Sequence, residues 1–176
     1  LLAGGHYNNW EWIATSLEQQ IKHKTFALYT PLSNKFFEKK MQQTRGKFGL
    51  TMVSIKKTAA FFEEYKNIPT ATIFGIDQSP RNPEKCYWMD FLNQETGVLF
   101  GLEKYAKEYN YPVLFCAISK IKRGYYTVRF SLVTDQPQAS PHGSIIEDTT
   151  QRLEQQIIKN PQYWLWSHKR WKHKRK

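Results

Sequence analysis

The sequence predicts an α/β fold with a mixed, mainly parallel sheet flanked by helices. Short apolar, β-rich segments alternate along the chain with stretches whose apolar residues recur every three or four positions, which is typical of parallel strands covered by helices. Near the C-terminal end, two strand-like segments flank the turn sequence Lys122-Arg123-Gly124, which predicts one antiparallel pair. The length of 176 residues and the hydrophobic content of 40% suit a substantial core. We therefore expect a single domain over residues 1–176.

The first half of the chain predicts three helices and two strands. Helices are indicated by apolar stripes, and strands by short β-rich runs between turn signals. In order, the expected elements are a helix with an apolar stripe from Trp10 to Ile21, a strand at 26–29, a helix from Pro31 to Gly46, a helix at 55–65 and a strand at 70–76. This alternation favours parallel pairing of the strands.

The second half of the chain predicts a polar loop followed by two helices and two strands. The expected elements are a polar loop at 77–85, a helix at 96–109, a strand at 112–119, its antiparallel partner at 125–133, a linker at 137–143 and a helix with an apolar stripe from Ile146 to Ile157. Pro161 follows the last helix and is expected to stop it.

The chain is strongly basic, with a formal net charge of +11. The last nine residues, 168–176, hold six of the 26 Lys and Arg residues and form a basic tail that we expect to lie outside the folded body. Such a charge favours anionic partners, which include phospholipid headgroups, phosphorylated glycolipids, acidic proteins and nucleic acid.

Other features of the sequence narrow the kind of protein further. Cys86 and Cys116 supply neither a disulfide framework nor a zinc-ligand set, which indicates a reducing compartment; we expect no metal and no cofactor. The longest apolar runs are shorter than the ~18 residues that a membrane-spanning helix needs. The chain begins at Leu1 without an initiator Met, so we expect it to be a piece of a longer protein.

His6 and Glu11 form the most informative motif of the chain. Five positions rotate by roughly 140° along a helix, so the two side chains cannot share one helix face. Asn8 is a favourable N-cap, and Asn8-x-x-Glu11 has the outline of a capping box. We therefore expect the helix to begin just after His6, with the imidazole folded back to the Glu11 carboxylate. The alternative is that Glu11 only satisfies the start of the helix.

No nucleophile motif accompanies this pair. The sequence has no Gly-x-Ser-x-Gly, and neither Cys86 nor Cys116 has a signature that places it beside a histidine. If His6 does chemistry, it therefore activates an incoming group rather than a nucleophile of the enzyme.

Three further segments join the motif Gly5-His6-Tyr7-Asn8-Asn9-Trp10-Glu11 in a recognisable order. They are Tyr29–Lys35 with Arg45 about one helix later, Phe74–Pro80, and Asn160–Lys172. With these segments the chain resembles the bacterial lipid A biosynthesis acyltransferases, the lauroyl and myristoyl transferases of the lysophospholipid acyltransferase superfamily. The resemblance runs over essentially the whole chain and implies a glycerolipid acyltransferase-like fold, preceded by a hydrophobic N-terminal anchor. One departure is that Ser79-Pro80-Arg81-Asn82-Pro83 stands where family members often have Gly-Pro after the Asp-Gln turn.

The resemblance implies a reaction that transfers a fatty acyl group from an acyl thioester, carried by acyl carrier protein, to a hydroxyl of a lipid A precursor. No covalent enzyme intermediate would form. His6 would be the general base, because imidazole changes protonation near neutral pH, and Glu11 would hold its tautomer. The phosphorylated glycolipid acceptor would be met at an anionic membrane surface, on the cytoplasmic face of the bacterial inner membrane.

Three residues are candidates for binding the substrate. Arg45 is implied by the resemblance and presents a guanidinium fork to a phosphate or an oxyanion; its alternative is a solvated arginine at a helix end. Asp77 follows a predicted strand, where loops of α/β proteins carry function. It would position Arg45 or an acceptor hydroxyl, or else cap a turn. Arg81 would contact an anionic headgroup, or else be solvated.

Phe36 and Phe37 lie among lysines and suit an interfacial helix that inserts aromatic rings among acyl chains. The alternative places both rings in the core.

Two other functions also stay open. The chain could acylate another glycolipid or a lysophospholipid, or it could be a basic nucleic-acid or membrane-binding module without catalysis, acting through the tail Lys169–Lys176. No recognised nucleic-acid motif occurs in that tail, so we expect no nucleic acid as partner.

Overall fold

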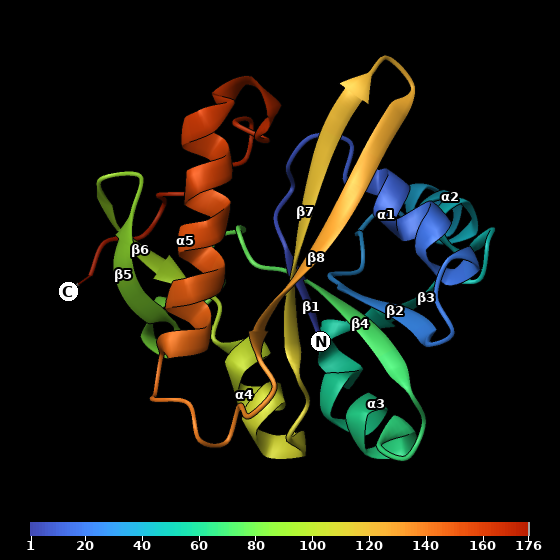
Figure 1. Cartoon of the computed structure of the whole chain (residues 1–176), viewed down its shortest axis with the longest axis horizontal. Coiled ribbons are helices and arrows are strands. Elements are labelled where there is room, and N and C mark those ends of the chain that lie inside the picture. Colours follow the sequence, from blue (N-terminus) through green and yellow to red (C-terminus); the bar gives the residue numbers. More distant parts are fainter. Residues whose placement is uncertain (176) are drawn as a thin grey trace. The chain divides into compact units, whose positions relative to one another are not determined.

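The computed structural model describes residues 1–175, whose helices and strands are labelled in Figure 1. The chain contains two compact units. Unit 1 combines Leu1–Asn8 with the chain from Gly75 onwards, and unit 2 is Asn9–Phe74. Unit 1 is therefore built from two separated stretches of sequence. The expectation of one domain over the whole chain stays a prediction.

Unit 2 holds parallel strands covered by helices. Its elements are α1 (Glu11–Ser16), the 3₁₀ turn η1 (Leu17–Gln19), β2 (Lys24–Tyr29), α2 (Lys35–Gly46), β3 (Thr51–Ser54), the 3₁₀ turn η2 (Ile55–Lys57), α3 (Thr58–Tyr65) and β4 (Thr70–Gly75). β2 pairs in parallel with both β3 and β4. The ring of Phe26 on β2 packs on Phe61 of α3, with centroids 4.6 Å apart, so an aromatic contact joins the strand to the helix.

The start of α2 differs from the prediction for a local reason. The helix begins at Lys35 rather than at Pro31, because the Asn34 side chain accepts hydrogen bonds from the backbone N–H groups of Phe36 and Phe37. The helix ends at Gly46, as predicted. None of its residues is fully buried; Glu38, Met41 and Arg45 are partly covered, and the other residues of the helix are exposed.

The start of α1 contradicts the predicted capping box. α1 begins at Glu11 with Trp10 at the N-cap position, and Asn8 adopts a left-handed conformation with φ of 54°. The backbone N–H of Asn8 donates to the carbonyl of Tyr163 at 2.7 Å, so a tertiary contact fixes this residue. Regular α-helix ends at Ser16, so α1 is shorter than the predicted apolar stripe, which runs to Ile21.

Unit 1 contains a parallel strand pair, two antiparallel hairpins and two helices. Apart from β5 and β6, which are described below, its elements are β1 (Leu2–Gly4), the 3₁₀ turn η3 (Pro83–Lys85), α4 (Gly101–Tyr109), β7 (Val113–Lys122), β8 (Tyr125–Thr134), α5 (Ser144–Lys159) and the 3₁₀ turn η4 (Pro161–Tyr163). β1 pairs with β7 in parallel, whereas β7 and β8 are antiparallel. Gly124, with φ of 80°, completes the two-residue turn between them. Parallel pairs in both units and one antiparallel partner confirm the predicted mixed α/β class.

A second hairpin in unit 1 was missed by the sequence analysis. β5 (Tyr87–Phe91) and β6 (Gln94–Val98) pair antiparallel, so the predicted helix at 96–109 is wrong over its first residues and begins at Gly101. The connecting Leu92 and Asn93 both have positive φ. Because this turn contains no glycine, the sequence carries no clear signal for it. The carboxylate of Glu154 on α5 accepts a hydrogen bond from the Leu92 N–H and supports this turn.

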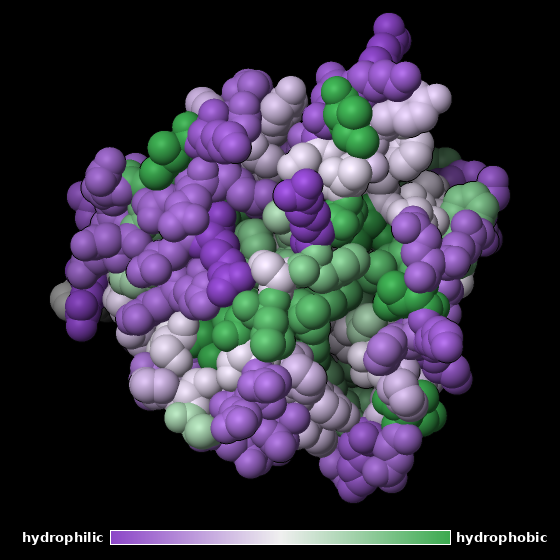
Figure 2. Space-filling view, in the orientation of Figure 1, coloured by the Kyte–Doolittle hydropathy of each residue, from purple (hydrophilic) through white to green (hydrophobic). Residues whose placement is uncertain are grey.

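α5 is the longest helix of the described residues and confirms the predicted apolar stripe. Its buried side includes Ile146, Leu153 and Ile157. The opposite side is largely hydrophilic, as the purple surface over α5 in Figure 2 shows. Within residues 1–175, no helix is both long and apolar enough to cross a bilayer.

Candidate active site

The first candidate site lies in unit 1, where two chain segments meet just after their strands end. The backbone N–H of Ile76 donates to the carbonyl of Gly4 at 3.0 Å, so His6 and Asp77 leave their strands side by side. Gly5 is needed at this point, because a Cβ there would lie 2.6 Å from the side chain of Leu153. The carboxyl ends of strands are where α/β proteins collect functional groups.

His6 and Asp77 form a hydrogen-bonded pair. His6 Nδ1 lies 2.6 Å from Asp77 Oδ1, and the His6 backbone N–H donates to Asp77 Oδ2 at 2.8 Å. The indole Nε1–H of Trp164 donates to the same Oδ2 at 2.9 Å. The carboxylate therefore receives one ring contact, one backbone contact and one indole contact, which together fix its orientation.

The Asp77 side chain is only 3% exposed but is held in its charged form. Burial raises the pKa of Asp77, but the hydrogen bonds from His6 and Trp164 and the charge of His6 outweigh it and hold the pKa below its ordinary value. A carboxylate accepts hydrogen bonds, so Nδ1 of a neutral His6 carries the ring proton. Nε2 of that tautomer is then an acceptor, and it lies 3.3 Å from Nε2 of Gln78.

The imidazole of His6 also packs closely on the backbone. A Cβ placed on Gly75 would lie 3.1 Å from Cε1 of His6, which is tighter than ordinary packing. A larger residue at this position would therefore displace the ring or the strand end. The ring is fixed by Asp77 through Nδ1 and by Gly75 through its Cε1 edge.

The C-terminal strap, defined as Trp164–His173, holds the loop that carries Asp77. Besides the indole contact of Trp164, the backbone N–H of Ser79 donates to His168 Nε2 at 2.9 Å. Nε2 of His173 lies 3.0 Å from the carbonyl oxygen of Pro80 and donates to it. The expectation that the basic tail lies outside the folded body is therefore wrong for the strap.

Glu11 and Arg45 form a separate pair within unit 2. Arg45 Nε and Nη2 donate to the two Glu11 carboxylate oxygens at 2.8 and 2.5 Å, which is the bidentate geometry of a guanidinium on a carboxylate. The Arg45 guanidinium also lies 5.0 Å from the ring centroid of Trp10. With its side chain 17% exposed, Arg45 is not a solvated arginine at a helix end.

The structure thus groups the predicted residues differently from the sequence analysis. The carboxylate at Nδ1 of His6 is Asp77, whereas the partner of Glu11 is Arg45. The pairing of His6 with Glu11 stays a prediction, because the two residues belong to different units. Arg81 is exposed in the loop after Pro80.

Trp164 and Gln78 are contacts of the site that were not assigned individually from the sequence. Both lie in segments that carried the family resemblance, namely 160–172 and 74–80. Position in those segments was the signal that could have identified them. What the sequence did not show is that Trp164 donates to Asp77 across 87 positions of the chain.

The two thiols are not activated as nucleophiles. Burial raises the pKa of Cys116 to about 12 and also raises the pKa of Cys86, so both are protonated at neutral pH and lack the thiolate that attacks carbonyl carbon. Over residues 1–175, no three His, Cys, Asp or Glu side chains are grouped as ligands for a metal ion. The chemistry that the arrangement supports is proton transfer at His6.

Comparison with protein families gives an independent result. The model of a family described as bacterial lipid A biosynthesis acyltransferase matches residues 1–173, which is nearly the whole chain and includes both pairs and the strap. No curated relative matches the chain.

Proposed function

Because the chain belongs to the bacterial lipid A biosynthesis acyltransferase family, we propose that it transfers a fatty acyl group from an acyl carrier protein thioester to a hydroxyl of a phosphorylated lipid A precursor. The observation that supports the mechanism is the contact between His6 Nδ1 and Asp77 Oδ1. An alcohol is a weak nucleophile, and a histidine whose tautomer is fixed by a carboxylate can accept its proton.

His6 acts as the general base in this proposal. Its Nε2 takes the proton of the acceptor hydroxyl while that oxygen attacks the thioester carbonyl carbon. The tetrahedral intermediate collapses with cleavage of the C–S bond, and the imidazolium returns the proton to the leaving thiolate. The products are an ester and a free thiol. Asp77 stabilises the imidazolium through Nδ1–H, and the protonated cysteines support a mechanism without an acyl-enzyme.

Glu11, Arg45 and Arg81 complete the proposed set of residues. Glu11 holds the Arg45 guanidinium in a fixed orientation through two hydrogen bonds, so it acts on the reaction through Arg45. Arg45 offers positive charge to a phosphate of the acceptor or to the developing oxyanion. Arg81, exposed in the loop that follows Asp77, offers a second cation to the anionic headgroup.

We further propose that α2 contacts an anionic lipid surface, on the cytoplasmic face of the inner membrane. The rings of Phe36 and Phe37 are 64% and 61% exposed, so the alternative that both belong to the core is wrong. Lys40 lies 5.9 Å from the ring centroid of Phe36, and Lys35 and Lys39 are exposed on the same helix. Aromatic rings beside lysines suit insertion at headgroup depth with ammonium groups at the phosphates.

The proposed function is tested by His6→Ala in an acyl transfer assay with acyl carrier protein thioester and lipid A precursor in vesicles. We expect the rate to fall by at least ~10²-fold, as for loss of a general base. The matched control is His23→Ala, since His23 is exposed and has no proposed role. Undiminished turnover of His6→Ala would remove this residue from the mechanism, and transfer to a lysophospholipid alone would reassign the acceptor.

A further inference from the structure

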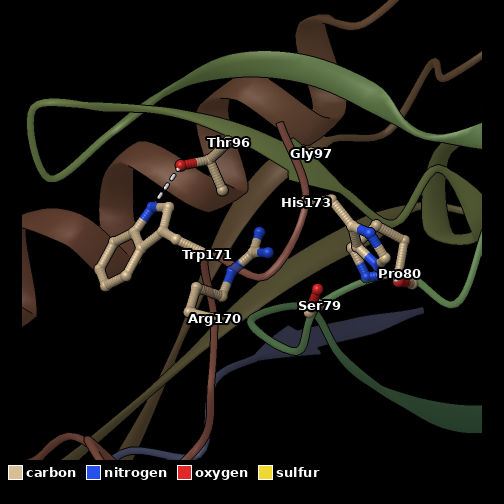
Figure 3. A pocket seen from close by; sticks show the side chains of 7 residues that line it. All are labelled: Ser79, Pro80, Thr96, Gly97, Arg170, Trp171 and His173. Carbon is tan, nitrogen blue, oxygen red and sulfur yellow. Dashed lines mark hydrogen bonds between the residues drawn. The ribbon is translucent and has the colours of Figure 1, made fainter. Parts of the chain in front are cut away.

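A narrow pocket lies beside the site in unit 1, between the loop that follows Asp77 and the C-terminal strap (Figure 3). Its empty volume is about 180 Å³, including solvent at its mouth. The lining residues are Ser79, Pro80, Thr96, Gly97, Arg170, Trp171 and His173. This set contains an arginine and a histidine but no carboxylate, so the pocket carries positive charge without a built-in counterion.

Arg170 is the residue that gives the pocket its charge. It is 3% exposed, and its Nε has no hydrogen-bond partner within residues 1–175. Burial lowers the pKa of Arg170 to about 10, so the guanidinium is still a cation at neutral pH. Its guanidinium points into the space between Trp171 and His173 in Figure 3.

Two groups lie near the Arg170 guanidinium, but within the described residues neither is an anion hydrogen-bonded to it. Asp77 interacts with Arg170 electrostatically, but its oxygens accept hydrogen bonds from His6 and Trp164. The ring of Phe91 lies 6.0 Å from the guanidinium carbon, which offers a π face but no acceptor. A buried charge without a hydrogen-bonded partner is unfavourable, and an entering anion would relieve this.

Two hydroxyl groups line the pocket, and one of them is available to donate to such an anion. Thr96 Oγ1 is already used, since it accepts from Trp171 Nε1 at 2.8 Å and donates to the carbonyl of Gln94 at 2.7 Å. Ser79 makes its described hydrogen bond through the backbone N–H to His168, which leaves its hydroxyl available as a donor. A guanidinium fork and a hydroxyl together match the oxygens of a phosphate.

We propose that the Arg170 pocket is a binding site for a phosphate group, held by the Arg170 guanidinium and the Ser79 hydroxyl. The inference rests on the proposed function, in which both substrates carry phosphate: the glycolipid acceptor as a headgroup, and the acyl carrier as the phosphodiester of its arm. In the present conformation the pocket is too narrow for a water molecule. A bound phosphate therefore separates the wall formed by Trp171 and His173 from Ser79.

Thermal unfolding of the chain with inorganic phosphate tests the site without any acyl transfer. We expect phosphate to raise the Tm above that in chloride at equal ionic strength, because a ligand that binds only the folded state stabilises it. Arg170→Met abolishes this rise. Ser79→Ala shifts the rise to phosphate concentrations higher by roughly ten-fold. Arg175→Met is the matched control, since Arg175 is on the same terminal segment, 61% exposed and paired with Glu95, and it keeps the full rise.

Two results would overturn the assignment. One is a wild-type Tm that responds equally to phosphate and chloride, and the other is an Arg170→Met variant that keeps the phosphate response. If Arg170→Met does not fold, Arg170→Lys decides the matter: it keeps the charge but loses the planar fork, so the phosphate response weakens if the site is real and stays unchanged if it is not.

Steady-state kinetics with Ser79→Ala then separate the two sources of phosphate. A KM raised for the phosphorylated acceptor but not for the acyl carrier thioester assigns the pocket to the acceptor headgroup, and the reverse assigns it to the donor arm. Unchanged KM values for both substrates would contradict a substrate subsite. Failure of the wild-type chain to transfer acyl groups would instead count against the proposed function and leave the phosphate response in place.

Discussion

At the scale of single residues, the site depends on how the Asp77 carboxylate is held. His6 and Trp164 reach it from segments 71 and 87 positions away, and neither contact follows from a local motif. The sequence identified His6, Asp77, Glu11 and Arg45 as individual candidates. The sequence predicts that Glu11 orients the His6 ring, because Glu11 is the acid nearest to His6 in the sequence. In the structure, Asp77 lies at Nδ1 of His6.

Trp164 is predicted to act as a positioning residue through Asp77. Trp164→Phe keeps an aromatic ring but removes the donor to Oδ2. A hydrogen bond to a charged group is worth enough that we expect kcat to fall by roughly ten-fold or more, while the KM values change little. The control is Trp166→Phe, because the Trp166 indole donates to the carbonyl of Pro161 instead. An equal loss in both variants would contradict the assigned role.

Asp77 is also predicted to shape the acid stability of the fold. Its folded pKa lies below the ordinary value, so the folded state binds fewer protons than the unfolded chain. The stability it contributes is full above about pH 5 and is lost as the pH falls through the folded pKa. In urea unfolding from pH 7 to pH 2.5, Asp77→Asn should flatten the acid decline, whereas Asp135→Asn, at an exposed position, should keep the wild-type slope.

At the scale of elements, local patterns predicted most helices and strands but not all of their ends. β2, β4, β7, β8 and α5 follow from apolar runs and stripes that are continuous in sequence. The hairpin of β5 and β6 was missed, because its turn at Leu92 and Asn93 lacks glycine and is supported by Glu154 on a distant helix. The predicted start of α1 was wrong, because the backbone N–H of Asn8 donates to the carbonyl of Tyr163 instead of Asn8 capping the helix.

α2 provides the prediction at this scale. Phe36→Ser combined with Phe37→Ser should change the free energy of unfolding by only about 0.5 kcal/mol per site, because both rings are exposed. Partition into vesicles with anionic lipid should fall by at least ~10-fold, since the apolar surface available for insertion is lost. Ile158→Ser serves as the control, because Ile158 is 67% exposed but lies on α5. Equal binding of wild type and double variant would contradict an interfacial α2.

At the scale of the whole molecule, the chain order and the spatial grouping differ. Unit 1 joins Leu1–Asn8 to the chain from Gly75 onwards, so the first eight residues fold with the C-terminal half. This grouping brings His6, Asp77 and the strap together. The net charge of +11 is also a property of the whole chain, and it favours association with anionic surfaces.

Deletion of residues 174–176 tests the contribution of this charge. The deletion removes three cations and leaves the strap, defined as Trp164–His173, intact. At about 1 kcal/mol for each cation near an anionic surface, vesicle binding at low ionic strength should weaken by up to about 100-fold, and the difference should shrink in high salt. Acyl transfer in detergent should be unchanged. A loss of transfer in detergent would show that this end of the chain serves the chemistry directly.

The sequence by itself determined the α/β class, the hairpin at Arg123-Gly124 and the candidate base, because periodicity, turn chemistry and the choice of an ionisable side chain are local properties. Only the tertiary structure decided that the Asp77 carboxylate lies at Nδ1 of His6, that the Arg45 guanidinium pairs with Glu11 and that the strap packs on the loop after Asp77. The arrangement in unit 1 depends on the hydrogen bonds from the Ile76 N–H to the Gly4 carbonyl and from the Trp164 indole to Asp77. The pair in unit 2 depends on the two hydrogen bonds from Arg45 to Glu11. No pattern within one stretch of chain encodes a contact between side chains 71 or 87 positions apart.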